Sequence, residues 1–331
     1  MRQSSAQRRF FSAGFGRLLR AAAVAAVGGY AFCPAVAAPV DNDVIRLGLT
    51  AAMLPDLNEN DARASIKALA TATARERGLA ADPEPHVYDG TAAATVGLQR
   101  GATNAIGLTT AEYWLIRREI RFDGFLISTL AHDPMERYVV LVPAASPAMA
   151  LTDLQGHDLT MLRGPQMSLA RVWLDVELAG GGHPTSVGYF GRITESGRPS
   201  RVVLPLFFGQ GDACVVNQRA LDTLIELNPQ VAKKIRVVAT SPPFVPSMFA
   251  LTRTLSPEFR DRALRELGAL DNSIVGQQVL TIFRTQHIAP YPETVLDSAL
   301  ELLDRHARLC PAANAALIGS LRQPKGALTV R

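Results

Sequence analysis

The chain alternates short runs of apolar, often β-branched residues with longer stretches in which apolar residues recur every three or four positions. This alternation is typical of α/β proteins and favours sheets that are largely parallel. The pattern predicts strands at 44–49, 86–88, 105–108, 137–142, 158–162, 202–206, 213–216, 235–239 and 248–251. It predicts helices at 61–76, 91–99, 168–178, 221–227, 256–270, 272–285 and 292–309, and one that begins near Thr109 and Thr110.

The predicted elements form two similar α/β units, which are joined by two extended connections near residues 137–146 and 238–252. A chain that crosses into a second unit and later returns builds two lobes with a cleft between them. A few residues at element ends are enough for a hinge. We therefore predict lobe 1 from residues 38–140 and 247–331, and lobe 2 from residues 141–246. Ligands of open α/β sheets bind beyond the carboxyl ends of the strands, and both lobes are expected to present such ends to the cleft.

The first 37 residues contain the segments of a secretory signal in their usual order. Five arginines and no acidic residue precede the apolar run 21–32, and the small-residue site Ala35-Val36-Ala37 follows it. The run is short for a bilayer span, so we predict cleavage after Ala37, with a surface helix or membrane anchor as the alternative. Arg8-Arg9-Phe10-Phe11 resembles the twin-arginine (Tat) signal, and export to the periplasm by the Tat or the Sec route stays open.

Export changes how the charge is interpreted. The 331 residues carry 34 Lys and Arg against 30 Asp and Glu, a net charge of +4 that by itself suggests nucleic acid or an acidic membrane as partner. Removing 37 residues with five arginines leaves 294 residues with 29 basic and 30 acidic side chains. Short basic pairs such as Lys233-Lys234 do not form a basic stripe with interleaved aromatic residues, so no nucleic-acid partner is expected.

Motifs of the common enzyme classes are missing from the sequence. It contains no G-x-S-x-G, H-E-x-x-H, Walker A or dinucleotide-binding motif, and no Cys or His spacing that indicates zinc. We expect a binding protein that is not an enzyme and has no cofactor, and a hydrolase or transferase that uses the cleft is the alternative. Cleavage after Ala37 would discard Cys33. The remaining Cys214 and Cys310 either form a disulfide or stay as buried thiols.

Five segments occur in an order and spacing that resemble a known family. They are 45–49, 100–113, 151–157, 207–214 and 238–243. The chain is similar here to the PhnD-like phosphate, phosphite and phosphonate-binding proteins of ABC transporters, which have the type 2 periplasmic binding protein fold. The resemblance implies a two-lobed α/β Venus flytrap with two hinge crossings, which closes on a small anionic ligand and delivers it to an ABC permease. A periplasmic sensor of the same fold that partners a membrane histidine kinase is the alternative, and a monomer is expected in either case.

The candidate ligand-binding residues lie mostly at predicted junctions between strands and helices. Thr109 and Thr110 open a helix, so they either hold an anion at its positive end or only cap it, and the same holds for Ser168 in lobe 2. Arg163 ends a strand, where its planar fork suits a carboxylate or phosphonate or a nearby surface carboxylate. Asp212 matches the acidic residue of the family's Gly-x-x-Asp-Ala turn, and either binds an amine on the ligand or holds the turn.

Three further candidates lie in the first lobe. Tyr113 points into the cleft or packs in the core. Thr50 and Met53 belong to the first loop, where the segment 50–54 has no aromatic hydroxyl, and Leu206–Gln210 replaces a Gly-Ser-His-like segment of the family. Fewer hydrogen-bond donors and more Met, Leu and Phe indicate either a ligand with apolar surface or an orphan site, and argue against phosphate and simple phosphonates.

Overall fold

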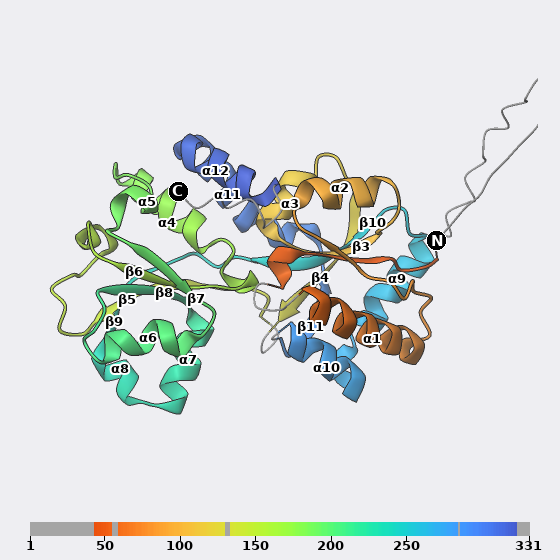
Figure 1. The fold of residues 1–331 in the computed structure, drawn as a ribbon, viewed down its shortest axis with the longest axis horizontal. Helices are drawn as coiled ribbons and strands as arrows, with labels where there is room; N and C mark the ends of the chain where they lie inside the picture. The colour runs from red at the N-terminus through yellow and green to blue at the C-terminus, as the bar shows by residue number, and fades with distance from the viewer. Residues whose placement is uncertain (1–42, 55–58, 130–132, 284, 323–331) are drawn as a thin grey trace, which may run out of the picture. The chain divides into compact units, whose positions relative to one another are not determined.

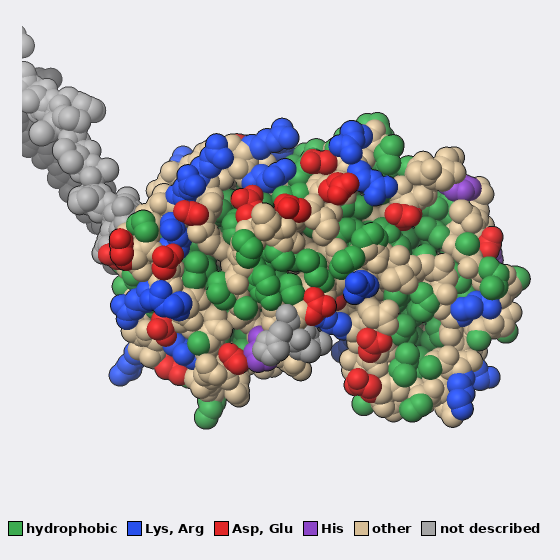
Figure 2. All heavy atoms as spheres, turned by 180° about the vertical axis from the view of Figure 1, so that it is seen from behind, with side chains coloured by type: hydrophobic (Ala, Val, Ile, Leu, Met, Phe, Trp, Pro, Cys, Tyr) green, Lys and Arg blue, Asp and Glu red, His purple; other side chains and the backbone are tan. Residues whose placement is uncertain are grey.

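The structure is a computed structural model that describes residues 43–54, 59–129, 133–283 and 285–322. All of them belong to one compact unit, Val40–Arg331. The predicted signal segment 1–37 lies outside the described residues. Among the helices that the structure describes, none has the length and apolar content needed to cross a membrane. On the face shown in Figure 2, basic and acidic side chains are interspersed.

The first sheet has six strands in the order β11-β4-β10-β3-β1-β2 (Figure 1). They are β1 (Leu47–Thr50), β2 (His86–Tyr88), β3 (Ala105–Thr109), β4 (Phe122–Thr129), β10 (Ser247–Thr252) and β11 (His287–Tyr291). β2 and β3 run parallel to β1, whereas β10 runs antiparallel to both β3 and β4, and β11 antiparallel to β4. In this register Gly107 of β3 pairs with Leu49 on one side and with Phe249 on the other.

The second sheet has five strands in the order β7-β6-β8-β5-β9. They are β5 (Tyr138–Pro143), β6 (Leu159–Leu162), β7 (Ile193–Ser196), β8 (Ala213–Asn217) and β9 (Ile235–Thr240). β6 is parallel to β7 and β8, whereas β5 is antiparallel to β8 and β9. The prediction of largely parallel sheets is therefore wrong. Both sheets are mixed, because β5 and β10, the first strand after each crossing between the sheets, insert antiparallel to their neighbours.

Helices cover both faces of each sheet (Figure 1). On the first sheet, one face carries α2 (Thr91–Gln99) and α3 (Thr110–Ile116), and the other carries α1 (Glu59–Arg77), α9 (Pro257–Leu267) and α10 (Ile274–Ile282). On the second sheet, one face carries α6 (Pro199–Phe207), α7 (Gln218–Leu227) and α8 (Gln230–Lys234), and the other carries α4 (Ala170–Gly180) and α5 (Ser186–Tyr189). Short 3₁₀ turns lie at Ala51–Met53, Leu151–Leu154, Pro165–Met167, Leu270–Asn272 and Glu293–Leu296.

The C-terminal helices join the two halves of the structure. α11 (Asp297–Leu309) packs against α3 and α4, and α12 (Pro311–Arg322) packs against α11 and α2. Ala299, Leu302 and Leu303 of α11 are buried in the same hydrophobic core as the second sheet. Cys310, which follows α11, and Cys214 of β8 are buried and not bonded to each other, so these two cysteines stay as thiols.

Two predicted elements need correction. Residues 202–206 are not a strand but lie inside α6, because Pro199 opens a helical turn and Val202, Val203 and Leu206 then fall on one buried face. A five-residue apolar run is compatible with either period, so the pattern alone does not decide it. The helix predicted from Ser168 starts instead at Ala170, after a 3₁₀ turn.

The two connections between the sheets pair with each other. Glu136 and Phe244 exchange backbone hydrogen bonds of 2.7 and 2.9 Å, and the Ser241 amide donates to the Tyr138 carbonyl at 2.8 Å. The predicted lobe boundary at residue 140 falls inside β5, which belongs wholly to the second sheet. The division into lobes and the hinge stay predictions.

Candidate functional site

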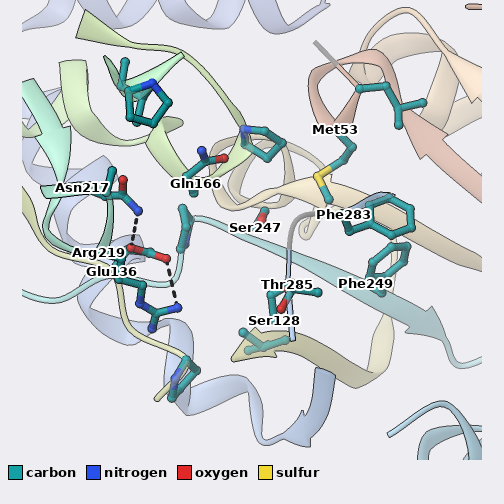
Figure 3. Close-up of a pocket in the computed structure, with 18 of the residues that line it drawn as sticks. Met53, Ser128, Glu136, Gln166, Asn217, Arg219, Ser247, Phe249, Phe283 and Thr285 are labelled. Atoms are coloured by element: carbon teal, nitrogen blue, oxygen red, sulfur yellow. Dashed lines mark hydrogen bonds and ion pairs between the residues drawn. The ribbon is translucent and has the colours of Figure 1, made fainter. Parts of the chain in front are cut away.

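A cavity of about 410 Å³ is lined by residues from the elements of both sheets (Figure 3). Several of these residues lie at strand ends, among them Leu162 at the end of β6 and Asn217 at the end of β8. Polar and apolar side chains are separated across the cavity: Figure 3 shows Glu136, Asn217 and Arg219 on one side and Met53, Phe249 and Phe283 on the other.

The polar side is organised around the carboxylate of Glu136, which lies in the first connection between the sheets. This carboxylate accepts a hydrogen bond from Asn217 Nδ2 at 2.9 Å and pairs with Arg219 Nη1 at 3.3 Å. Nη2 of the same guanidinium donates to the carbonyls of Asp133 and Met135 at 2.7 and 2.9 Å. Arg219 therefore ties the N-terminus of α7 to the connection that leads into β5.

Burial has a strong effect on Glu136. Its side chain is 11% exposed, and that of Arg219 is 25% exposed. Loss of hydration raises the pKa of Glu136 above its ordinary value of 4.5, although the hydrogen bond from Asn217 and the charge of Arg219 act in the opposite direction. The raised pKa means that the two partners compensate only part of the desolvation of this carboxylate.

The N-terminus of α7 also belongs to the polar side. β8 ends at Asn217 and α7 begins at the next residue, and Arg219, Ala220 and Thr223 of this helix line the cavity. Asn217 does not cap the helix, because its Nδ2 turns to Glu136, and its buried Oδ1 has no hydrogen-bond partner among the described residues. The positive end of a helix and a guanidinium thus lie together, which favours negative charge at this position.

The apolar side is formed by Met53 and Leu54, which follow β1, and by Phe249 of β10 and Phe283 after α10. The two phenyl rings pack edge to face, with their centroids 5.1 Å apart and their planes at 88°. The same four side chains belong to one hydrophobic cluster. This wall offers an apolar surface to the body of a ligand.

The hydroxyls predicted in the first lobe are engaged within the protein. Thr50 and Thr109 both donate to a carboxylate oxygen of Glu112, at 2.8 and 2.9 Å. The Glu112 amide donates back to Thr109, so that a capping box starts α3. Thr110 donates to the Val245 carbonyl at 2.5 Å. Thr109 therefore caps α3, which is one of the two roles predicted for it.

Two more predicted residues also have partners within the protein. Ser168 donates to the Pro246 carbonyl at 2.7 Å and does not open a helix. Tyr113 is buried, and its hydroxyl donates to Glu293 at 2.5 Å while its ring packs against Phe125. Of the eight predicted residues, Met53 is the one that lines the cavity.

Arg163 and Asp212 are not among the residues that line the cavity, although Leu162 and Pro165, on either side of Arg163, are. Arg163 is exposed immediately after β6. Asp212 precedes β8, at the opposite end of the strand from Asn217, where it accepts from the Asp158 amide at 3.0 Å and lies 3.6 Å from His157 Nδ1. These contacts hold a turn, and a role for Arg163 or Asp212 in ligand binding stays a prediction.

Glu136, Asn217 and Arg219 were not predicted as site residues. Asn217 and Arg219 lie between the strand predicted at 213–216 and the helix predicted at 221–227, so the rule that ligands bind at strand ends contains the signal for them. Nothing in the sequence marks Glu136 in a comparable way. It lies next to the predicted connection 137–146 and belongs to no motif. Among the described residues there is no group of three or more His, Cys, Asp or Glu side chains that could hold a metal ion.

Comparison with known proteins identifies the family. A family model described as the periplasmic substrate-binding protein of a phosphonate ABC transporter matches residues 51–293, which is more than half of the chain. The chain belongs to this family. Its members are substrate-binding components of transporters, which bind a small ligand and act with an ABC permease. No curated protein matches the chain.

Solved structures with the same fold support this assignment at the level of architecture. The XAC2383 protein of Xanthomonas citri bound to ATP has a TM-score of 0.57 and 16% identity, with 81% of this chain and 99% of that chain covered. A binding protein component of an ABC phosphonate transporter from Pseudomonas aeruginosa has a TM-score of 0.54 and 13% identity, with coverages of 85% and 96%. PhnD1 of Prochlorococcus marinus in complex with methylphosphonate has a TM-score of 0.53 and 14% identity, with coverages of 81% and 98%. The fold is that of the type 2 periplasmic binding proteins.

Proposed function

We propose that this protein is exported to the periplasm, where it binds a small organic anion in the 410 Å³ cavity and delivers it to an ABC permease. The observation that carries the proposal is the division of the cavity into two sides. The N-terminus of α7 and the guanidinium of Arg219 lie on one side, and the apolar wall around Phe249 lies on the other.

The negative charge of the ligand is inferred from the polar side. A guanidinium has five N–H donors, and the contacts of Arg219 with Asp133, Met135 and Glu136 use three of them. The amide of Gln218, the first residue of α7, already donates to the Arg137 carbonyl at 2.8 Å. The remaining donors of Arg219 and the positive end of the helix suit an acid group. Two proteins of the same fold were solved with methylphosphonate and with ATP, which both carry phosphorus oxyanions.

The organic part of the ligand is inferred from its other neighbours. Glu136 partly cancels the positive potential of Arg219, so a small, doubly charged ion such as phosphate gains little here. Asn217 Oδ1 offers a buried acceptor that an N–H or O–H group of the ligand would satisfy. The apolar wall would cover a hydrocarbon body. A monoanion with an apolar body and a hydrogen-bond donor fits all three features.

Isothermal titration of the processed protein tests this proposal with a panel of phosphate, methylphosphonate, phenylphosphonate, alkylsulfonates, carboxylates and amino acids. At 100 times its dissociation constant, a true ligand also raises the stability by about 2.7 kcal/mol. Arg219→Met should weaken the binding of the best anion at least tenfold. Lys233→Met, which removes an exposed positive charge from α8, is the matched control and should leave the affinity unchanged. Absence of binding by every anion of the panel would refute the proposal.

Export is tested separately from binding. Cell fractionation should place the product in the periplasm, with an N-terminal sequence that begins at Ala38. The double variant Arg8→Lys and Arg9→Lys should block export if the Tat route is used and should leave it intact if the Sec route is used. A full-length protein that starts at Met1 in the cytoplasm would contradict the export proposal without affecting the binding proposal.

The permease step requires a change of shape on binding, and we place the hinge in the paired segments around Glu136 and Phe244. Small-angle scattering should show a smaller radius of gyration with a bound anion than without it. An unchanged radius would argue against closure.

A further inference from the structure

A second cavity, of about 120 Å³, lies between α1, α10 and the first sheet. Its walls are almost entirely apolar. They include Ile66 of α1, Leu251 of β10, Leu267 of α9, Leu280 of α10 and Ile288 of β11. All of these except Leu267 are buried.

The two cavities share a wall. Phe249, Phe283 and Thr285 line both the 410 Å³ cavity and the 120 Å³ cavity. Figure 3 shows the two phenyl rings beside Met53, on the apolar side of the larger cavity. Both rings are only partly buried. The two rings therefore form the boundary between the two cavities.

Gly107 leaves room for the ring of Phe249. Gly107 of β3 pairs with Phe249, and a Cβ atom at Gly107 would lie 2.9 Å from Phe249 Cε1 and 2.6 Å from Leu49 Cδ2. Phe249 and Phe283 also pack with Leu54 and Ile66 in one cluster, although Leu54 lines the larger cavity and Ile66 the smaller one. Apolar surface is thus continuous from one cavity to the other.

Few polar groups line the smaller cavity. The hydroxyl of Thr285 donates to the His287 carbonyl at 2.8 Å, and a carboxylate oxygen of Asp82 accepts from the Glu84 amide at 2.9 Å. Thr73, which is 5% exposed, lines the cavity with a buried hydroxyl that has no partner among the described residues. These three side chains are the polar ones among the described residues that line the cavity. Because the rest of the lining is apolar, the cavity suits an apolar group better than a polar one.

We propose that the ligand of this receptor is amphiphilic, and that its alkyl or aryl tail passes between Phe249 and Phe283 into the 120 Å³ cavity while its acid head stays at Arg219. This inference rests on the proposed function and specifies its substrate class. An engineered apolar cavity of about 150 Å³ is known to bind benzene, so the smaller cavity is expected to accept the end of a tail about as large as a benzene ring.

A series of n-alkylphosphonates from methyl to octyl tests the proposal by titration calorimetry on the processed protein. Each methylene that enters the smaller cavity should tighten binding about fourfold, which corresponds to about 0.8 kcal/mol per buried methylene. The gain should stop once the cavity is full. Equal dissociation constants for methylphosphonate and octylphosphonate would overturn the inference, and would leave the receptor function intact.

Two variants of α1 locate the tail. Ala74→Leu fills the smaller cavity, which Ala74 lines, whereas Ala72→Leu changes a residue of the same helix that lines neither cavity. In Ala74→Leu the preference for octylphosphonate over methylphosphonate should fall tenfold or more, while methylphosphonate binds as before. Ala72→Leu should keep the preference. A preference that survives in Ala74→Leu would overturn the placement of the tail.

A separate measurement is needed if no alkylphosphonate binds. In that case phosphonates are not the ligands of this receptor. Saturating benzene should then raise the melting temperature of the unmodified protein and of Ala72→Leu, and should leave that of Ala74→Leu unchanged. Such a result would support an apolar subsite for a ligand with a different acid head. No shift in the unmodified protein would overturn the inference. If Ala74→Leu fails to fold, the chain-length series and benzene on the unmodified protein decide the question.

Discussion

Replacing Arg219 by methionine probes the ion pair on the polar side of the cavity. The variant keeps a side chain of similar length but removes the charge that faces Glu136. It leaves a carboxylate that is 11% exposed with a single described donor, Asn217 Nδ2. We expect Arg219→Met to be less stable than the unmodified protein at pH 8.

The size of the loss follows from the geometry. Two unit charges 3.3 Å apart interact by about 5 kcal/mol at an effective dielectric constant of about 20. Desolvation of both groups opposes this attraction, and the guanidinium keeps 25% of its side-chain surface in water. The carbonyls of Asp133 and Met135 can accept hydrogen bonds from water once the guanidinium is gone. The expected decrease in the free energy of unfolding is about 2–3 kcal/mol.

The loss should depend on pH in a definite direction. Burial already raises the pKa of Glu136 above 4.5, and removal of the cation raises it further. A carboxyl group whose pKa is higher in the folded than in the unfolded protein takes up its proton first in the folded state. Stability therefore decreases as the pH rises from 4.5 through the folded pKa. The deficit of Arg219→Met should be full at pH 8 and should shrink as the pH approaches 4.5.

Urea unfolding, followed by tryptophan fluorescence at pH 8 and pH 5, measures both effects. The double variant Glu136→Gln with Arg219→Met is the control, because it removes the buried charge together with its partner, and it should recover most of the stability at pH 8. A loss below about 0.5 kcal/mol in Arg219→Met would refute the reasoning. So would a double variant as unstable as the single one, or a deficit that does not change with pH.

Tyr113→Phe should lower the free energy of unfolding by about 1–2 kcal/mol, because it removes the hydrogen bond to Glu293, and calorimetry should show unchanged anion affinity. Weaker binding in this variant would instead support the predicted ligand role of Tyr113. Cys214 and Cys310 are buried, and burial raises the pKa of both thiols, so a disulfide reagent should label neither in the folded protein. After denaturation it should label two thiols per processed chain, and three in an unprocessed chain that retains Cys33. Rapid labelling without denaturant would contradict the burial of the thiols.

The sequence by itself determined the fold class and most of the elements, because both depend on neighbours within a few residues. The predicted strand 86–88 and helix 91–99 occur at the same residues. α1 ends at Arg77, and Gly78 follows it with a φ of +62°, as expected for a residue that stops a helix. The family also followed from short segments in a fixed order. Local pattern was insufficient at 202–206, where a short apolar run fits either a helix or a strand.

The tertiary structure alone decided which polar groups face the cavity. Ser168 donates to the carbonyl of Pro246, which is 78 residues away, and Thr50 donates to Glu112, 62 residues away. No spacing along the chain predicts such partners. Glu136 enters the site because the connection that contains it lies against the end of β8 and the start of α7. Strand order in the two sheets determines which strand ends meet, and this order results from packing of the whole chain rather than from any one segment.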